Sequence, residues 1–393
     1  MCTHPLVSED SIAYSVESMR PSLTALLALV VLGLLSVSAW RSASTPGWNL
    51  DGSFYAVLMQ SDSQPLEVRH RAAYASTAEL APADAQAALE RGSDYRRALH
   101  DHVEVFALQL PFYTNKPLYL WCGKLARVCG AAVARAPYVV SALAWLAIAV
   151  GLTLLAIQSG ARPLWVPIAA ALSVLSPPLR ELADLATPDA LSTGLLVAGA
   201  SVAVRSPVWA TLPLMAASLA RPDVGILALG ILAACWTQDP TWPRARAISA
   251  AGLAVVATSL LVPVLTHSYG WEVLMRHTFV QRCVTPDDFQ RAHVGWSDYL
   301  VAVGKGLHGH DVSRRARFEP FLALAAVSGV AYFKTQRSAQ ARAALHLLVA
   351  IWIATAVRFL VFPAFGDRHF APAHVLSVAL SCALLASLRR KNA

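Results

Sequence analysis

One lysine lies in an aromatic stretch at a boundary between polar and apolar sequence. Residues 112–121 read FYTNKPLYLW, and nearly continuous apolar sequence extends from Leu118 to Ile157. Lys116 therefore stands where water gives way to hydrocarbon, and an ammonium group held there can bind an anionic lipid headgroup. The alternative is interfacial anchoring, in which the neighbouring tyrosines and tryptophan form an aromatic belt and the lysine only extends to the membrane surface.

The same stretch resembles a segment of a known enzyme superfamily. The order FYTNKPLYLWCGKLA, then a short amphipathic run, then ARAPYVVSALAWLAIAVGL is similar to the segment before the second membrane span of GT-C glycosyltransferases. That segment reads roughly Tyr-x-x-Lys-Pro-Pro-Leu-Tyr-Tyr-Trp. The superfamily includes aminoarabinose transferases and protein O-mannosyltransferases, which take a sugar from a polyprenyl phosphate carrier. Lys116 and Pro117 match the pattern, whereas Leu118 stands where the second proline usually is.

A carboxylate follows the first apolar segment. Asp51 precedes a short amphipathic run with Phe54 and Tyr55, as does the acidic residue of the first outer loop in GT-C enzymes. The resemblance implies that Asp51 is the base that activates the acceptor hydroxyl, a contribution of about 10²–10⁴ in rate. Alternatively, Asp51 is the N-cap of a helix at 52–60. The two roles are compatible.

Three more carboxylates lie in a short loop on the same predicted side of the membrane, at Glu181, Asp184 and Asp189. Thr187, Pro188 and Asp189 have the features of a helix start, since they supply a cap, a proline in the first turn and an acid at the positive end of the dipole. The resemblance implies a second role for Asp189, near the metal or the donor phosphate. Asp184 and Glu181 are secondary candidates for that role.

Two arginines precede predicted spans on this side. Arg221 lies in an Arg-Pro-Asp turn that resembles the Arg-Pro or Lys-Gly turns of many GT-C proteins, or it belongs to a plain helix start. Arg368 lies in GDRHFAP, which resembles the Arg-Tyr-x-x-Pro element before the last span. The resemblance implies that both bind the donor phosphate, which guanidinium geometry favours. Arg358, inside a predicted span, either snorkels or faces the same phosphate.

A divalent cation is an open question. Many GT-C relatives use one to neutralise the donor phosphate, and carboxylate oxygens of Asp51 and Asp189 would suit Mg²⁺ or Mn²⁺. The His-x-His pairs at 100–102 and 308–310 have no further ligand at a diagnostic spacing, so they do not indicate a metal site.

The composition is that of a polytopic membrane protein. The chain has 393 residues, of which 56% are hydrophobic and 14% charged, with a mean hydropathy of +0.49. Basic residues scatter among loops, so the formal charge of +8 reflects membrane orientation and not nucleic-acid binding. The six cysteines show no paired metal-ligand spacing and predict no zinc site or disulfide framework.

We expect one all-α, GT-C-like domain over residues 1–393, with about ten spans. The predicted spans are 22–40, 137–157, 163–175, 190–204, 207–219, 224–236, 247–266, 321–333, 343–362 and 370–388. Some are short for a full crossing, and 207–236 could instead be a re-entrant hairpin. Basic residues of short loops concentrate on the amino-terminal side. The positive-inside rule then places the long loops 41–135 and 268–318 outside. Residues 1–21 are either a short cytoplasmic tail or the product of an overextended start codon.

These features together favour an inverting glycosyltransferase of the bacterial inner membrane, with a polyprenyl-phosphate sugar donor and its active site on the periplasmic face. Asp51 would deprotonate an acceptor hydroxyl on a glycan, lipid or protein, while Lys116 and Arg368, together with Arg221, stabilise the leaving phosphate. The alternatives are a lipid-linked sugar flippase or transporter, and a non-catalytic subunit that binds polyprenyl phosphate. Acids gathered on one face and the lack of a repeat favour the enzyme over the transporter. The hypothesis requires Asp51 and Lys116 to meet in one cavity.

Overall fold

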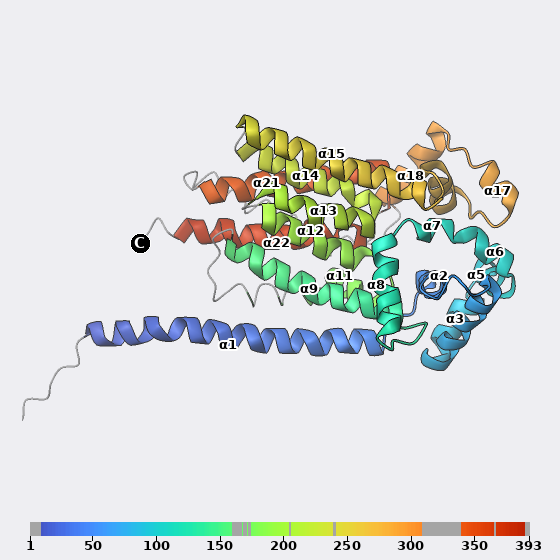
Figure 1. Cartoon of the computed structure of the whole chain (residues 1–393), viewed down its shortest axis with the longest axis horizontal. Helices are drawn as coiled ribbons and strands as arrows, with labels where there is room; N and C mark the ends of the chain where they lie inside the picture. Colours follow the sequence, from blue (N-terminus) through green and yellow to red (C-terminus); the bar gives the residue numbers. More distant parts are fainter. Residues whose placement is uncertain are drawn as a thin grey trace, which may run out of the picture.

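The chain folds into helices, in a computed structural model that describes residues 9–158, 167, 171, 174–203, 206–238, 241–308, 339–364 and 367–389. Within these residues the backbone is helical or irregular and contains no strand, which confirms the predicted all-α class for this part of the chain. The helices form a long bundle and, at one of its ends, an outer module built from the two predicted outer loops (Figure 1).

The bundle has its core between short apolar helices at its centre. It comprises α1 (Glu9–Ser44), α9 (Ala136–Gln158), α11 (Pro177–Asp184), α12 (Asp189–Ala203), α13 (Pro207–Ala220), α14 (Gly225–Gln238), α15 (Trp242–Leu265), α21 (Ala339–Val361) and α22 (Asp367–Arg389). The closest packing joins α12 to α13 and α9, and α14 to α21. Trp145, Ile148, Leu196 and Ile231 are fully buried there. Large apolar side chains such as Leu253 and Ile353 face outward, as expected for contact with lipid.

Four helices in the described part are long and apolar enough to cross a bilayer, which indicates a membrane protein. These are Ala25–Ser44, Ala136–Gln158, Pro243–Leu265 and Arg342–Val361. They coincide with four of the predicted spans. Three further predicted spans correspond to the shorter apolar helices Asp189–Ala203, Val208–Ala220 and Pro222–Gln238, and 370–388 lies within α22. The predicted span 321–333 and most of 163–175 lie outside the described residues.

Two helices begin earlier than the sequence predicted. α1 starts at Glu9 and not at Ser22, so most of the predicted cytoplasmic tail is helical; α15 starts at Trp242 and not at 247. Hydropathy marks only the apolar portion of a helix, whereas backbone hydrogen bonding continues through polar residues. The predicted starts were therefore those of the apolar portions.

The outer module is assembled from both long loops. The first loop contributes α2 (Leu50–Leu58), α3 (Leu66–Leu80), α4 (Ala83–Arg91), α5 (Asp94–Asp101), α6 (Val103–Gln109), α7 (Pro111–Thr114) and α8 (Pro117–Val128). The second contributes α16 (Trp271–Met275), the π-helix η2 (Arg276–Val280), α17 (Pro286–Gln290) and α18 (Trp296–His308). Hydrogen bonds hold the loops together, from Gln109 Nε2 to the Cys283 carbonyl (2.9 Å) and from the Tyr269 hydroxyl to the Leu108 carbonyl (3.0 Å).

An aromatic column fixes the inner side of this module. Phe54 of α2 stacks on Phe106 on one side and Tyr113 on the other, with ring centroids 4.5 and 4.3 Å apart. Such contacts contribute about 0.5–1.5 kcal/mol each beyond the burial of their area. Phe54 is fully buried, so α2 is held against α6 and α7.

Close packing of α14 on α21 generates a prediction about stability. A Cβ atom on Gly230 would lie 2.8 Å from Ala354 Cβ and 3.0 Å from the Ala350 carbonyl oxygen. We expect Gly230→Ala to lower the free energy of unfolding by about 1–3 kcal/mol, because the backbones must separate. Thermal unfolding of the purified protein in detergent measures this. Gly33→Ala is the control, since no atom lies within 4 Å of that position; equal melting temperatures for the two variants would contradict the packing.

Candidate functional site

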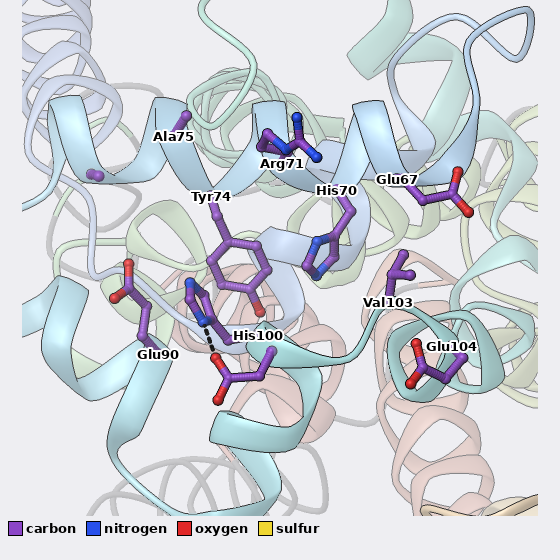
Figure 2. Close-up of a pocket in the computed structure, with 11 residues that line it drawn as sticks. Glu67, His70, Arg71, Tyr74, Ala75, Glu90, His100, Val103 and Glu104 are labelled. Atoms are coloured by element: carbon purple, nitrogen blue, oxygen red, sulfur yellow. Dashed lines mark hydrogen bonds and ion pairs between the residues drawn. The ribbon is translucent and has the colours of Figure 1, made fainter.

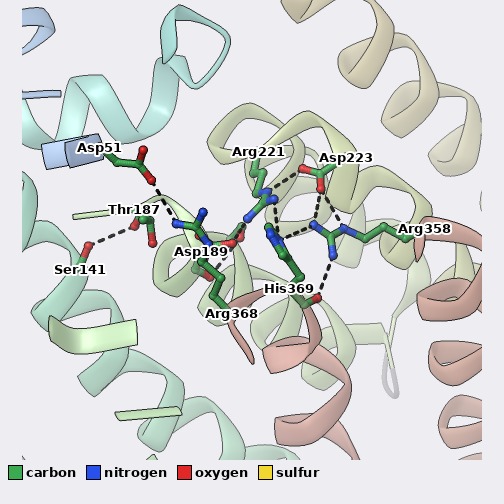
Figure 3. A network of polar contacts seen from close by, with 10 residues as sticks. Asp51, Ser141, Thr187, Asp189, Arg221, Asp223, Arg358, Arg368 and His369 are labelled. Atoms are coloured by element: carbon green, nitrogen blue, oxygen red, sulfur yellow. Dashed lines mark hydrogen bonds and ion pairs between the residues drawn. The ribbon is translucent and has the colours of Figure 1, made fainter. Parts of the chain in front are cut away.

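Charged side chains converge where the outer module meets the ends of the short helices (Figure 3). We call this group the charge cluster; it consists of Asp51, Lys116, Asp189, Arg221, Asp223, Arg358, Arg368 and His369. Arg221 and Asp223 lie at the turn between α13 and α14, where Pro222–Val224 form the short 3-10 helix η1. The cluster thus combines residues of the first outer loop with residues of α12, of the turn between α13 and α14, of α21 and of α22.

Asp51 belongs to the first turn of α2 and does not cap it. The N-cap is Asn49, whose Oδ1 accepts hydrogen bonds from the Tyr138 hydroxyl (3.1 Å) and from the Ala186 N–H (3.1 Å). The alternative that Asp51 is the N-cap is therefore wrong. Gly52 permits this placement, because a Cβ there would lie 2.7 Å from the Tyr138 hydroxyl. The Asp51 carboxylate is left to interact outside its own helix.

The two oxygens of Asp51 have different partners. Tyr113 donates its hydroxyl proton to Oδ1 (2.9 Å), and Arg368 Nη1 donates to Oδ2 (3.1 Å). The side chains of Asp51 and Arg368 are 27% and 33% exposed, more than the arginines deeper in the cluster. The pair therefore forms the accessible side of the cluster and ties α2 to the start of α22.

Arg221 is the centre of the buried side. Its guanidinium forms ion pairs with Asp189 and with Asp223 Oδ1 (Nε, 2.7 Å), and Nη2 lies 3.0 Å from His369 Nδ1. Asp189 is almost fully buried. Because a guanidinium can only donate, His369 Nδ1 must accept, so the imidazole is neutral and carries its proton on Nε2.

Arg358 completes the buried side. It donates through Nε to Asp223 Oδ2 (2.8 Å) and through Nη1 to the His369 carbonyl (2.9 Å), and its side chain is 6% exposed. This arginine therefore pairs within the protein and does not snorkel. Burial alone would raise the pKa of Asp223, but Arg221 and Arg358 outweigh it and hold that pKa well below its usual range.

Lys116 lies beside Asp51 without pairing with it. It is the N-cap residue of α8, and its Nζ donates to the Phe112 carbonyl (2.5 Å) and to Asn115 Oδ1 (2.8 Å). The ammonium also lies 5.4 Å from the centre of the Tyr113 ring, whose hydroxyl binds Asp51. Burial lowers the pKa of Lys116 to about 7. Among the described residues, no carboxylate forms an ion pair with it.

The cluster has an excess of positive charge. It holds four basic side chains, Lys116, Arg221, Arg358 and Arg368, against three carboxylates, Asp51, Asp189 and Asp223. His369 is neutral. A partly desolvated excess cation attracts an anion, and Arg and Lys together suit phosphate oxygens.

Two predicted carboxylates, Glu181 and Asp184, belong to α11. The Asp184 carbonyl accepts a hydrogen bond from the Gly47 N–H (3.0 Å), which fastens the segment before α2. From the same predicted loop, Asp189 joins the charge cluster through its ion pair with Arg221.

The carboxylates do not form a metal-binding set as they stand. Arg368 engages Asp51 and Arg221 engages Asp189, so the two predicted ligands each already neutralise a guanidinium. The described part of the chain contains no group of three or more His, Cys, Asp or Glu side chains arranged to hold a metal ion. His310 lies outside that part.

Sequence reasoning missed the roles of three residues. Tyr113 was predicted only as part of an aromatic belt, Asp223 only as part of a helix start, and His369 only as a member of the GDRHFAP element. One signal was available for Asp223: an arginine within a membrane segment needs a counter-ion. Arg358 therefore indicated that an acidic residue lies at the same end of the bundle.

The fold and the cluster together define a helical membrane protein with a basic, partly open polar site at one end of its bundle. Comparison with models of protein families, with curated proteins and with solved structures finds no match to this chain. The function is therefore inferred from the site itself.

Removing a buried acid of this network should destabilise the protein more than removing an acid at the surface. Asp223→Asn leaves Arg221 and Arg358 without their shared charge partner, so we expect the free energy of unfolding to fall by about 3 kcal/mol. Asp62→Asn is the matched control, because Asp62 pairs with Arg69 and Lys124 at the surface with 72% exposure, and such pairs contribute about 1 kcal/mol or less. Denaturant or thermal unfolding in detergent compares them; similar losses would contradict a network that stabilises the bundle.

Proposed function

We propose that the protein is a GT-C-type membrane glycosyltransferase that transfers a sugar from a polyprenyl-phosphate carrier to an acceptor hydroxyl, with inversion. The observation that carries this proposal is the proximity of an excess of cations to a carboxylate that is oriented but only partly covered. The cations can neutralise the phosphate that leaves, and the carboxylate can accept the proton that the acceptor hydroxyl must lose. Asp51 and Arg368 form the accessible side of the cluster, and Lys116 is partly buried next to Tyr113, which binds Asp51.

The phosphate would be bound by Lys116 and Arg368, with Arg221 behind them. Lys116 has no carboxylate partner among the described residues, and Arg368 is the most exposed arginine of the cluster's ion pairs. The carrier phosphate needs charge neutralisation and no protonation when it leaves the sugar. These basic side chains supply that charge.

Asp51 would act as the base. Tyr113 and Arg368 each use one of its oxygens, which fixes the carboxylate and leaves further lone pairs for the hydroxyl of an acceptor. The acceptor oxygen forms a bond to the anomeric carbon as the bond from that carbon to the phosphate oxygen breaks. The proton passes to Asp51, and the carrier leaves as a phosphate monoester.

The carrier's hydrocarbon needs an apolar surface near this end of the bundle. A cavity of about 450 Å³ lies there, lined by Trp271, Trp296 and Tyr299 and by Leu360 and Val361 at the end of α21. It continues a stripe of exposed apolar residues along α21, namely Val349, Ile353, Val357 and Leu360. This surface supports a substrate that arrives from the membrane.

The proposal includes ten spans, a GT-C fold, and a periplasmic site in a bacterial inner membrane.

The base assignment is tested by Asp51→Asn. We expect consumption of polyprenyl-phosphate sugars, offered as a panel to the protein in lipid nanodiscs, to fall by about 10²–10⁴ because Asn cannot accept the proton. Carrier binding should persist or tighten, since Arg368 loses its internal partner. Asp94→Asn, an exposed acid of the outer module, is the control. Unchanged consumption by Asp51→Asn would reject the base; carrier binding without any consumption by the unaltered protein would indicate a binding subunit.

Lys116 predicts a pH dependence of binding. Its pKa of about 7 means that the ammonium loses its proton as the pH rises above 7, and a bound phosphodiester should restore it. We expect carrier affinity to fall by up to about tenfold per pH unit above 7, with proton uptake of somewhat less than one per carrier at pH 8. Calorimetry in buffers of different ionisation enthalpy measures the uptake. Lys116→Arg should retain binding without uptake; equal uptake in that variant would assign the proton to another group.

A further inference from the structure

One face of α8 packs against the protein, and the opposite face is apolar and exposed in the described part of the chain. Tyr119 and Gly123, which lie one turn apart, are buried. Trp121, Leu125 and Val128 recur at intervals of four and three residues, so they share the other side of the helix. Their exposed fractions are 63%, 62% and 84%. Water-facing helix surfaces carry polar side chains, so this face needs an apolar partner.

Other parts of the outer module have the polar surface that water favours. α3, α4, α5 and α6 lie beyond α8, farther from the bundle (Figure 1). The carboxylates Glu67, Glu90, Asp101 and Glu104 border a cavity among these helices (Figure 2). Such side chains are mostly exposed to water in proteins. The face of α8 differs from this surface in its chemistry, although both belong to one module.

The position of α8 relative to the spans indicates its partner. Residues 129–135 connect it to α9, which is long and apolar enough to cross a bilayer. Figure 1 shows α8 running across the direction of α9 and α1, at the level where α1 ends. A helix in this position lies along the boundary of the membrane and does not cross it.

Tryptophans mark the same boundary on both α1 and α8. Trp40 lies about one turn before the end of α1 and is 75% exposed. Tryptophan is enriched where hydrocarbon meets water. Of the aromatic residues predicted to form a belt beside Lys116, Trp121 is the exposed one, since Tyr119 is fully buried and the Tyr113 hydroxyl binds Asp51. The tryptophan of that segment is therefore the residue placed for contact with lipid.

The charged side chains of α8 lie between its two apolar faces. They are Lys124 and Arg127, which are three residues apart and so form a strip along the helix. Lys124 Nζ pairs with Asp62 (2.8 Å), in the segment between α2 and α3, so the strip lies on the side of the outer module. Helices that lie in the membrane interface have this division, with apolar residues toward the acyl chains and basic residues toward the phosphates.

We propose that α8 is an in-plane anchor that docks the outer module on the phospholipid surface. Trp121, Leu125 and Val128 insert among the upper parts of the acyl chains, and Lys124 and Arg127 lie at the headgroup phosphates. The partner is the bilayer itself. The inference requires only that the bundle is embedded in a membrane, and it does not depend on the transferase proposal.

Docking also determines the depth of Lys116, the N-cap residue of α8. A helix held at the boundary keeps its first residue near the level of the lipid phosphates. A phosphate group carried by a lipid therefore reaches this ammonium without leaving the membrane surface.

Quenching of tryptophan fluorescence by brominated lipids tests the docking, with the full-length protein in phosphatidylcholine nanodiscs. The chain has 11 tryptophans, so the difference between the unaltered protein and Trp121→Phe isolates the Trp121 component. We expect lipid brominated near the headgroup to quench this component about twofold more than lipid brominated near the chain end, because interfacial tryptophans lie at headgroup level. Iodide in the water should quench it weakly.

A charge on the exposed face should release the helix from the lipid. In a Leu125→Glu background the Trp121 component should lose its quenching by brominated lipid and become accessible to iodide. Val68→Glu is the matched control, because it adds the same charge at an exposed apolar position of α3, and it should leave the quenching unchanged.

Two results with the otherwise unaltered protein would overturn the proposal. Quenching of the Trp121 component by iodide and not by lipid would place this face in water. Quenching by neither would place it against another protein chain. Unchanged lipid quenching in Leu125→Glu would also contradict insertion of the face.

Discussion

The ion pairs of Arg221 are the interaction on which the site depends. This guanidinium joins Asp189 at the start of α12, Asp223 in η1 and His369 in the first turn of α22. A buried charge is tolerated only when it is paired and hydrogen-bonded. Arg221 therefore keeps the ends of these helices together, and Arg358 adds α21 through the same Asp223.

Short helices create the space that this network fills. α13 and α14 have 14 residues each and α12 has 15. At about 1.5 Å per residue, each spans roughly 21–23 Å, less than the ~30 Å hydrocarbon thickness. Their polar ends are thus recessed relative to a full span. The outer module contributes Asp51 and Lys116, which share Tyr113 as a neighbour: Asp51 accepts a hydrogen bond from its hydroxyl and Lys116 lies over its ring.

Much of the fold was predictable because hydropathy acts over long segments. The predicted span 137–157 differs from α9, residues 136–158, by one residue at each end, and 343–362 falls close to α21. Helix starts in polar sequence were not predictable in this way, as Glu9 and Trp242 show. The helices of the outer module were even harder to predict from hydropathy, since α3 has almost no apolar face to mark it.

The sequence predicted which residues form the candidate site, and it did not predict which of them pair with one another. Asp51, Lys116, Asp189, Arg221 and Arg368 were each candidates on the strength of the resemblance to GT-C enzymes, and the structure brings them together. The partners of these residues were not identified, because Arg358 and Asp223 lie 135 positions apart in the sequence and Asp51 and Arg368 lie 317 positions apart. No local pattern encodes such contacts. The N-cap interpretation of Asp51 failed because α2 begins at Leu50, so that Asn49 occupies the N-cap position and its side-chain oxygen binds Tyr138 of α9 and the Ala186 N–H.

The pairing of Asp51 with Arg368 links the two halves of the proposed reaction. A phosphodiester that binds Arg368 competes with the Asp51 carboxylate for the same guanidinium. Each hydrogen bond that Arg368 donates to the phosphate weakens its hold on Asp51 Oδ2, while Tyr113 continues to orient the carboxylate through Oδ1. Donor binding would thus free Asp51 Oδ2 for the acceptor hydroxyl while Tyr113 keeps the carboxylate in place, so that the base and the donor phosphate are positioned together.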